Sequence, residues 1–147
     1  MTPPDQGEQV MDRIEIEALL NATYAARHAG DVDGILAAFA PGASYRIAGD
    51  SESCPMAAEH HGEALAPAVT AMCEMFQSQA WNITNMIIDG DKAAVTIEAR
   101  FTFAPTGDTA ETRIVDIWTF RDGRAVDVIE YADTAHLMRL AALAPPG

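Results

Sequence analysis

Four long strand candidates, joined by very short turns, fill the second half of the chain. They are separated only by Asp89-Gly90-Asp91, Pro105-Thr106-Gly107-Asp108 and Arg121-Asp122-Gly123, which are typical turn sequences. A connection between parallel strands needs about a dozen residues or more, so strands joined by such short turns must be antiparallel neighbours. We therefore predict an antiparallel meander, with strands over residues 80–89, 92–104, 109–121 and 124–133.

The first half of the chain has helical periodicity. From Ile16 to Tyr24 the apolar residues recur every three or four positions, as on one face of a helix. Asp12 precedes this pattern as a candidate N-cap, and Gly30 follows it as a candidate stop. We expect the first helix between these two residues.

A short helix and a short strand are expected next. Asp31 is a candidate cap for the second helix, whose apolar side includes Phe39 and which Pro41-Gly42 ends. Residues 43–47 alternate like a short strand. Residues 48–61 have no clear period and are predicted to form a loop.

Two further helices complete the pattern. The third carries Leu65 near its start and Phe76 on its apolar side, and a short last helix follows Asp133. Helices and strands are therefore segregated along the chain, which is typical of an α+β fold. We expect the three N-terminal helices to cover one face of a curved antiparallel sheet, with a short C-terminal helix.

Length and charge limit the classes of function. The 147 residues suit one domain, which we expect over residues 12–147 after a flexible tail at residues 1–11. The net charge of −13 offers no basic surface for nucleic acid or anionic membranes, so neither is an expected partner. No apolar run is long enough to span a bilayer and no secretion signal is found, so a cytoplasmic protein is expected.

Sequence motifs for metals and cofactors are missing. Cys54 and Cys73 form no CxxC pair and have no zinc-ligand spacing with the histidines. Glu59-His60-His61-Gly62-Glu63 contains ligand types, but adjacent residues rarely converge on one ion. We interpret His60 and His61 as part of a loop at the mouth of a pocket. No glycine-rich phosphate loop or nucleophile elbow occurs, so we expect neither a metal nor a cofactor.

Alternation within the strand candidates predicts which side chains face the helices. Apolar residues should point inward, and polar residues should face solvent or a partner subunit. The predicted inward sets of the last three strands are Val95, Ile97, Ala99, Phe101 and Phe103; Thr112, Ile114, Asp116, Trp118 and Phe120; and Val126, Val128 and Glu130. Two acids are thus predicted to lie on apolar faces.

A carboxylate on an apolar face is a candidate catalytic group. Burial without a partner costs several kcal/mol or raises the pKa of the acid until it is neutral. Raised pKa values allow carboxyl groups to act as acids and bases near neutral pH. Asp116 and Glu130 are therefore candidate catalytic residues. The alternative interpretation is structural. Asp116 would form an ion pair with Arg113 or Arg100, or Glu130 would lie at a solvent-exposed edge of the sheet.

Arg27 and His28 have two interpretations. Both would lie in the last turn of the first helix, where cationic side chains suit the helix dipole, and this interpretation is favoured. Arg27 also continues the apolar stripe of that helix, so the alternative is that its side chain reaches into a pocket.

Three stretches of the chain resemble a known family. They are the helix end HAGDVDGILAAFAPGASY, the segment HHGEAL before the third helix, and DIWTFRDGRAVDVIEYADTAHL. In these stretches and in the order of its elements, the chain resembles the nuclear transport factor two-like superfamily over about residues 12–140. The resemblance implies a cone-shaped fold with a deep pocket that holds a small apolar molecule. Its enzyme members include steroid isomerases, limonene-type epoxide hydrolases and SnoaL-like polyketide cyclases.

Individual positions are similar to different members of this superfamily. Asp116 matches the protonated aspartate of ketosteroid isomerases, Tyr24 lies one residue from their tyrosine, and Ile47 stands at or near the position of their base. Glu130 is similar to the acid in the last strand of the epoxide hydrolases, whose Arg-x-Asp motif is replaced by Glu98-Ala99-Arg100. SnoaL-like cyclases depend on one carboxylate base near the end of the sheet, a role that Glu130 would fill.

We therefore expect a SnoaL-like pocket protein, an isomerase, cyclase or hydrolase that uses carboxylate acid–base chemistry on a small apolar substrate. The candidate catalytic residues are Asp116 and Glu130, and the candidate substrate-binding residues are Tyr24, Tyr45, Trp118, Ile47, Phe76 and Ile97. The alternative is a non-catalytic module for ligand binding or dimerisation. A homodimer is expected through the outer sheet face, with Arg100, Arg113, Val115, Ile117 and Ile129.

Overall fold

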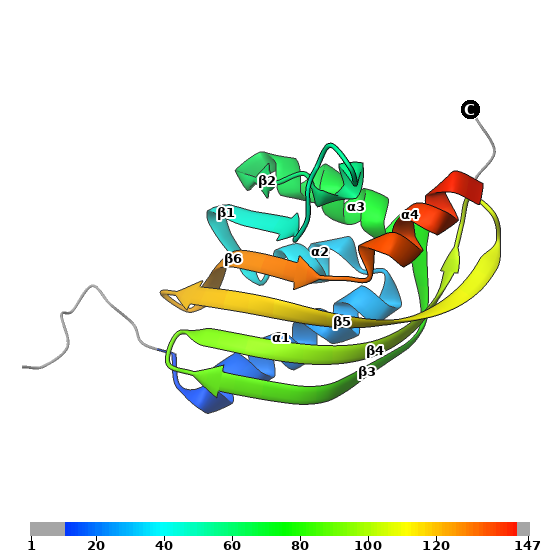
Figure 1. Ribbon diagram of the computed structural model, residues 1–147. Helices are drawn as coiled ribbons and strands as arrows, with labels where there is room; N and C mark the ends of the chain where they lie inside the picture. Colours follow the sequence, from blue (N-terminus) through cyan, green and yellow to red (C-terminus); the bar gives the residue numbers. More distant parts are fainter. Residues whose placement is uncertain (1–10, 144–147) are drawn as a thin grey trace, which may run out of the picture.

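A computed structural model describes residues 11–143 and shows a curved, unclosed sheet of six strands with helices against one face (Figure 1). The flexible tail expected at residues 1–11 lies outside the described residues except for Met11. The elements in chain order are α1 (Arg13–Ala29), α2 (Val32–Leu36), β1 (Phe39–Ile47), η1 (Pro55–Ala57), β2 (His60–His61), η2 (Gly62–Ala64), α3 (Leu65–Met75), β3 (Phe76–Asp89), β4 (Lys92–Phe103), β5 (Asp108–Arg121), β6 (Arg124–Tyr131) and α4 (Thr134–Leu143).

Local capping determines both ends of α1, as the sequence predicted. The Asp12 carboxylate accepts a hydrogen bond of 2.8 Å from the backbone N–H of Glu15. Gly30 ends the helix in the left-handed conformation, with φ of 71°, and its N–H bonds back to the last turn. The predicted apolar stripe is confirmed, because Ile16 and Tyr24 are both buried.

The second helix is shorter than predicted, and the first strand is longer. Phe39 lies in β1 and not on a helix, and β1 continues through Pro41-Gly42. Phe39 lies opposite Ala125 of β6, and its ring is 5.8 Å from that of Trp118. These long-range contacts outweigh the local helical pattern. Between Phe39 and Ser44 the strand register shifts, which accommodates the proline and the glycine.

A similar correction applies at the end of α3. Phe76 was predicted on the third helix, but it begins β3 and lies opposite Phe103 of β4. The pairing of two phenylalanines across the sheet favours the strand at this junction. Residues 48–61 are not wholly a loop, because they contain η1 and the short strand β2, which pairs with β1 through His60 and His61.

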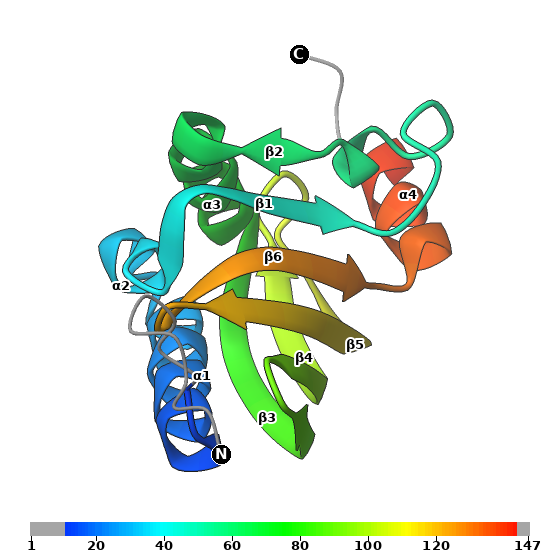
Figure 2. The same cartoon turned by 90° about the vertical axis from the view of Figure 1, so that its left-hand side faces the viewer.

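The predicted meander is confirmed. Strands β3 to β6 are antiparallel neighbours, and the order across the sheet is β2-β1-β6-β5-β4-β3 (Figure 2). The first strand enters this sheet beside the last, because β1 runs parallel to β6. Glu130 opposite Ile47 therefore lies in the interior of the sheet and not at an edge.

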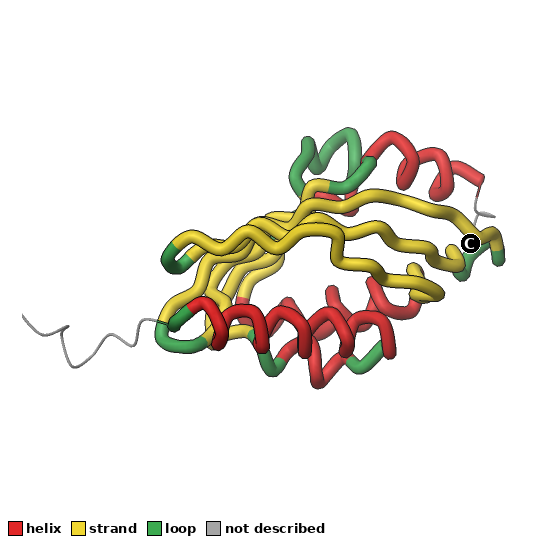
Figure 3. The backbone as a smooth tube through the Cα atoms, turned by 90° about the horizontal axis from the view of Figure 1, so that it is seen from below, coloured by secondary structure: helices red, strands yellow, loops and turns green. Residues whose placement is uncertain are grey.

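The core lies between the curved sheet and the helices, with α1 along one face of the sheet (Figure 3). The predicted inward sets of β4 and β5 are confirmed as buried, except that Thr112 is half-buried. In β6 the prediction is wrong at one position, because Ala125 and Val128 are the buried residues and Val126 is only half-buried. Phe120 pairs with Ala125 and Thr119 with Asp127, so Val126 is the extra residue of a β-bulge.

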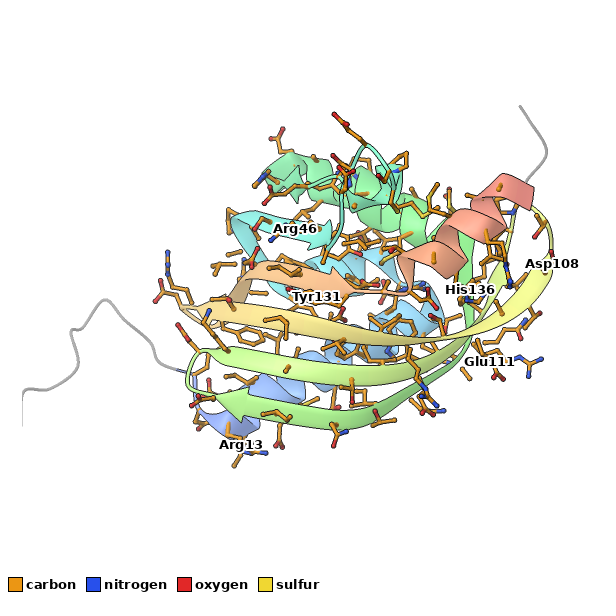
Figure 4. All side chains as sticks on the ribbon, in the orientation of Figure 1. Arg13, Arg46, Asp108, Glu111, Tyr131 and His136 are labelled. Atoms are coloured by element: carbon orange, nitrogen blue, oxygen red, sulfur yellow. The ribbon has the colours of Figure 1, made fainter. Side chains whose placement is uncertain are left out.

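The opposite face of the sheet is more polar. Figure 4 shows Tyr131 on β6 and Glu111 near the start of β5. Both are exposed, and Tyr131 is 51% exposed. In the described part of the chain, no helix has the length and apolar character needed to cross a membrane.

Candidate functional site

A mainly apolar cavity of about 100 Å³ lies between the helices and the concave face of the sheet. Its walls come from α1, α2, β1, α3, every strand of the meander, and the start of α4. The polar side chains in the lining are few, and two of them are the predicted acids, Asp116 and Glu130. The two candidate catalytic residues therefore face the same cavity.

Asp116 is held by a buried hydrogen-bond network. The Tyr24 hydroxyl donates a bond of 2.7 Å to Asp116 Oδ2, and Trp118 Nε1 donates a bond of 2.9 Å to the same hydroxyl oxygen. The other carboxyl oxygen, Oδ1, is buried and has no hydrogen-bond partner within residues 11–143. Asp116 thus does not pair with Arg113, which instead lies 3.6 Å from Glu98 on the outer face.

Glu130 has a tyrosine partner of its own. The Tyr45 hydroxyl donates a bond of 2.9 Å to Glu130 Oε2 and also lies 3.7 Å from the sulfur of Met72. The hydroxyl has one proton, and a carboxylate is the stronger acceptor, so the bond to Glu130 dominates. The parallel pairing places Tyr45 opposite Val128, two residues before Glu130, on the same face of the sheet.

The pairing of β5 with β6 brings the two acids together. Asp116 and Glu130 are directly opposite each other, and both side chains point to the concave face. Burial raises the pKa of Asp116 well above its ordinary value, and the nearby charge of Glu130 raises it further, although the Tyr24 hydrogen bond and Arg27 oppose the shift. Burial also raises the pKa of Glu130, against the hydrogen bond from Tyr45 and the charge of Arg27.

These environments differ in how strongly they favour the protonated form of each acid. Asp116 has the stronger tendency to keep its proton, because it is deeply buried and Glu130 faces it. Burial also raises the pKa of Tyr24 and of Tyr45 well above the ordinary value, so both remain hydrogen-bond donors. A neutral carboxyl group beside a carboxylate provides one proton donor and one proton acceptor in the same cavity.

Most of the candidate substrate-binding residues line this cavity. Tyr24, Tyr45, Ile47, Phe76 and Trp118 all contribute to its wall. Ile97 does not, although it is buried. It belongs to the same hydrophobic core cluster as Tyr24 and Trp118, which do line the cavity.

Sequence reasoning favoured the wrong environment for Arg27. Its side chain is buried, only 8% exposed, and lines the cavity instead of ending the helix in solvent. The signal was its position three residues after Tyr24 on the apolar stripe of α1. His28 is exposed and hydrogen-bonds to Ser78. Met72 and Trp81 also line the cavity.

The histidine pair has a different place from the one predicted. His60 and His61 form β2, and neither lines the cavity. His61 lies 3.5 Å from Glu59 on the surface. Among residues 11–143, no group of three or more histidine, cysteine or acidic residues is arranged to hold a metal ion.

The chain is similar in sequence to one protein family and in fold to several solved structures. The sequence matches the SnoaL-like domain family over residues 20–128, and no curated protein matches the chain. An NTF2-like protein of unknown function from Burkholderia pseudomallei is 25% identical, with a TM-score of 0.74; the match covers 88% of this chain and 98% of that one.

Two other solved structures have the same fold. An NTF2-like protein from Burkholderia xenovorans is 27% identical, with a TM-score of 0.70; the match covers 88% of this chain and 97% of that one. TerC, which was co-crystallised with polyporic acid, is 22% identical, with a TM-score of 0.71 over 87% of this chain and 98% of TerC.

Proposed function

The chain belongs to the SnoaL-like domain family, and we propose that it is an enzyme that uses carboxylate acid–base chemistry on a small apolar substrate. The reaction would be an isomerisation, cyclisation or hydrolysis without a cofactor. One observation carries the proposal: Asp116 and Glu130 face each other in one apolar cavity, each hydrogen-bonded to a tyrosine.

The proposed chemistry is proton transfer at a carbon next to a carbonyl group. Glu130, as the carboxylate, takes the proton from that carbon, and the electron pair of the C–H bond moves toward the carbonyl oxygen. The neutral carboxyl group of Asp116 donates a hydrogen bond to the developing oxyanion. In a substrate whose enolate is conjugated with a C=C bond, Glu130 then returns the proton to the far carbon of that system, which completes an isomerisation. In a cyclisation, the enolate carbon instead adds to a second carbonyl carbon of the same molecule, the π bond of that carbonyl breaks, and its oxygen takes the proton from Glu130.

The tyrosines position the two acids in this scheme. Tyr45 holds the Glu130 carboxylate, and Tyr24 holds the Asp116 carboxyl group while Trp118 holds Tyr24. Ile47 and Phe76 provide apolar contacts for the substrate from β1 and β3. Ile97 acts from the core by supporting the wall, since it does not line the cavity.

Deuterium exchange tests this chemistry without knowledge of the natural substrate. The protein is incubated in D₂O with a panel of small ketones and enones, and NMR follows the loss of protons next to the carbonyl group. We expect exchange above the buffer rate for at least one compound. Because Glu130 is the proposed base, Glu130→Gln should lower that rate about 100-fold or more.

Matched variants make this result specific. Asp116→Asn should also slow the exchange, because the amide is a weaker donor to the oxyanion than a neutral carboxyl group. Glu111→Gln removes an exposed acid near the start of β5 and should leave the exchange rate unchanged. Exchange that is equally fast in Glu130→Gln would exclude Glu130 as the base.

The alternative function is ligand binding without catalysis. The observation in its favour is that each acid already accepts a tyrosine hydrogen bond, as a purely structural network would require. A compound that binds in the cavity but shows no exchange, with or without the two acids, would support this alternative.

A further inference from the structure

A buried cation lies in the same cavity as the two acids, and the proposed chemistry does not use it. Arg27 is only 8% exposed and lines the cavity. Its Nη2 donates a hydrogen bond of 2.7 Å to the backbone carbonyl of Phe76. Its Nε is buried and has no hydrogen-bond partner within residues 11–143.

A second unpartnered donor lies beside this guanidinium. The Arg27 guanidinium carbon is 5.2 Å from the centre of the Trp81 ring, which is a cation–π contact. Trp81 Nε1 is also buried and has no partner among the described residues. The Trp81 ring in turn stacks on Tyr24 at 6.0 Å. One aromatic wall thus connects Arg27 to the tyrosine that holds Asp116.

The chemistry of these two groups defines what would satisfy them. A guanidinium N–H and an indole N–H can only donate hydrogen bonds, so both require an acceptor. The guanidinium is also a buried cation, and it forms no ion pair with any acid among residues 11–143. A buried charge costs free energy unless an opposite charge lies close to it. A carboxylate oxygen provides both the acceptor and the charge.

The size of the cavity limits the rest of the molecule. An apolar cavity of about 150 Å³ is large enough to hold benzene, and the cavity here is about 100 Å³. Its other lining residues are mainly aliphatic and aromatic. A ligand that fits would have a short apolar body of a few carbon atoms.

We propose that the ligand of this cavity is a small organic acid whose carboxylate accepts hydrogen bonds from Arg27 Nε and Trp81 Nε1. The carboxylate is held at the aromatic wall, and the rest of the molecule, with the carbonyl group that the proposed chemistry requires, extends toward Asp116 and Glu130. This inference rests on the proposed function in taking the cavity as the substrate site, and it adds the substrate class. Arg27 and Trp81 then select for a substrate that is anionic at one end.

NMR can test this directly, because the chain has two tryptophans and therefore two indole N–H signals. The probe is butyrate, and the control ligand is 2-pentanone, which has a methyl group in place of one carboxylate oxygen. We expect butyrate to move the Trp81 indole proton downfield as it accepts a hydrogen bond. The Trp118 signal should move less, since its N–H is already bonded to Tyr24. Trp81→Phe assigns the signals.

Calorimetry on variants gives the second readout. Arg27→Gln should weaken butyrate binding roughly 10-fold or more, and Trp81→Phe, which keeps an aromatic ring, should weaken it about 5-fold. The affinity for 2-pentanone should change little in both. Arg100→Gln removes an exposed arginine of β4 and should change neither affinity.

Two results would overturn the inference: butyrate that binds no better than 2-pentanone, or butyrate affinity that is unchanged in both Arg27→Gln and Trp81→Phe. Trp81→Phe decides the question if Arg27→Gln does not fold. If butyrate binds with the expected pattern among the variants but no compound shows deuterium exchange, the proposed catalysis is contradicted. The proposed binding of a carboxylate by Arg27 and Trp81 is then still supported.

Discussion

Asp116 and Glu130 lie directly opposite each other on β5 and β6, and each accepts a hydrogen bond from a different tyrosine. Two acids that face each other in an apolar cavity repel when both are ionised, so the pair keeps a proton at a pH where exposed carboxyl groups have lost theirs. This relationship has consequences for stability as well as for chemistry.

The stability of the folded protein should fall as the pH rises from about 4 toward neutrality. Burial and the charge of Glu130 raise the pKa of Asp116 in the folded state. An acid whose folded pKa is raised stabilises the fold below its unfolded pKa, and this stabilisation is lost as the pH rises through the folded pKa. Each unit of difference corresponds to about 1.4 kcal/mol.

Urea unfolding across this pH range measures the effect. Asp116→Asn should flatten the fall in the free energy of unfolding, because the amide does not ionise. Asp108→Asn, at an exposed position of the same strand, should keep the slope of the wild type. A wild-type free energy of unfolding that rises over this range, with the same slope in Asp116→Asn, would contradict the assignment.

Loss of the Tyr24 hydroxyl should destabilise the fold. In Tyr24→Phe, Asp116 Oδ2 loses its donor and Trp118 Nε1 loses its acceptor. Leaving buried groups unpaired should lower the free energy of unfolding by about 1–3 kcal/mol. Tyr131→Phe removes a hydroxyl from a residue that is 51% exposed, and it should change the free energy by less than about 0.5 kcal/mol. Equal effects in the two variants would refute the structural role of the network.

The end of α1 should depend on the left-handed backbone of Gly30. An added Cβ would meet no atom within 4 Å, so the cost of Gly30→Ala arises from the backbone conformation at φ of 71°. We expect a loss of about 1–2 kcal/mol in the free energy of unfolding. Gly30→Asn should lose less, because asparagine tolerates this conformation. If thermal denaturation ranks asparagine below alanine, strain is not the cause.

The expected homodimer can be tested on the outer face of β5. Arg113 is exposed there, while Val115 and Ile117 are half-buried. If a second copy covers this face, Ile117→Asp should shift the protein toward monomer in sedimentation velocity. Thr109→Asp places the same charge on the same face at the exposed far end of the strand and should not shift it. A wild-type protein that sediments as a monomer would rule out the dimer.

The parts of the fold that depend on local chemistry could be predicted from the sequence. Asp12 and Gly30 cap α1 through contacts within one turn, and the short turns of the meander leave no other pairing of β3 to β6. Phe39 and Phe76 could not be assigned in this way. Each stands at a junction where an apolar residue fits a helix or a strand, and contacts with distant strands decide between them.

The two acids of the candidate site could be predicted from the sequence, but the residues that contact them could not. Asp116 and Glu130 stood out as acids on apolar strand faces. Tyr45 reaches Glu130 through the parallel pairing of β1 with β6, for which the sequence has no local signal. The role of Arg27 depends on how the end of α1 is covered, and helix periodicity alone left two environments open for it.

Because of the bulge at Val126, the hairpin of β5 and β6 has one extra residue in β6, and Glu130 still lies opposite Asp116. Phe120 pairs with Ala125 and Thr119 with Asp127, and from there the ladder continues regularly to Asp116 and Glu130. A chain that lacked Val126 would make the same pairs without a bulge, whereas the present chain without a bulge would place Ile129 opposite Asp116. This position is therefore where a hairpin of the same architecture can gain or lose one residue and still keep its two acids face to face.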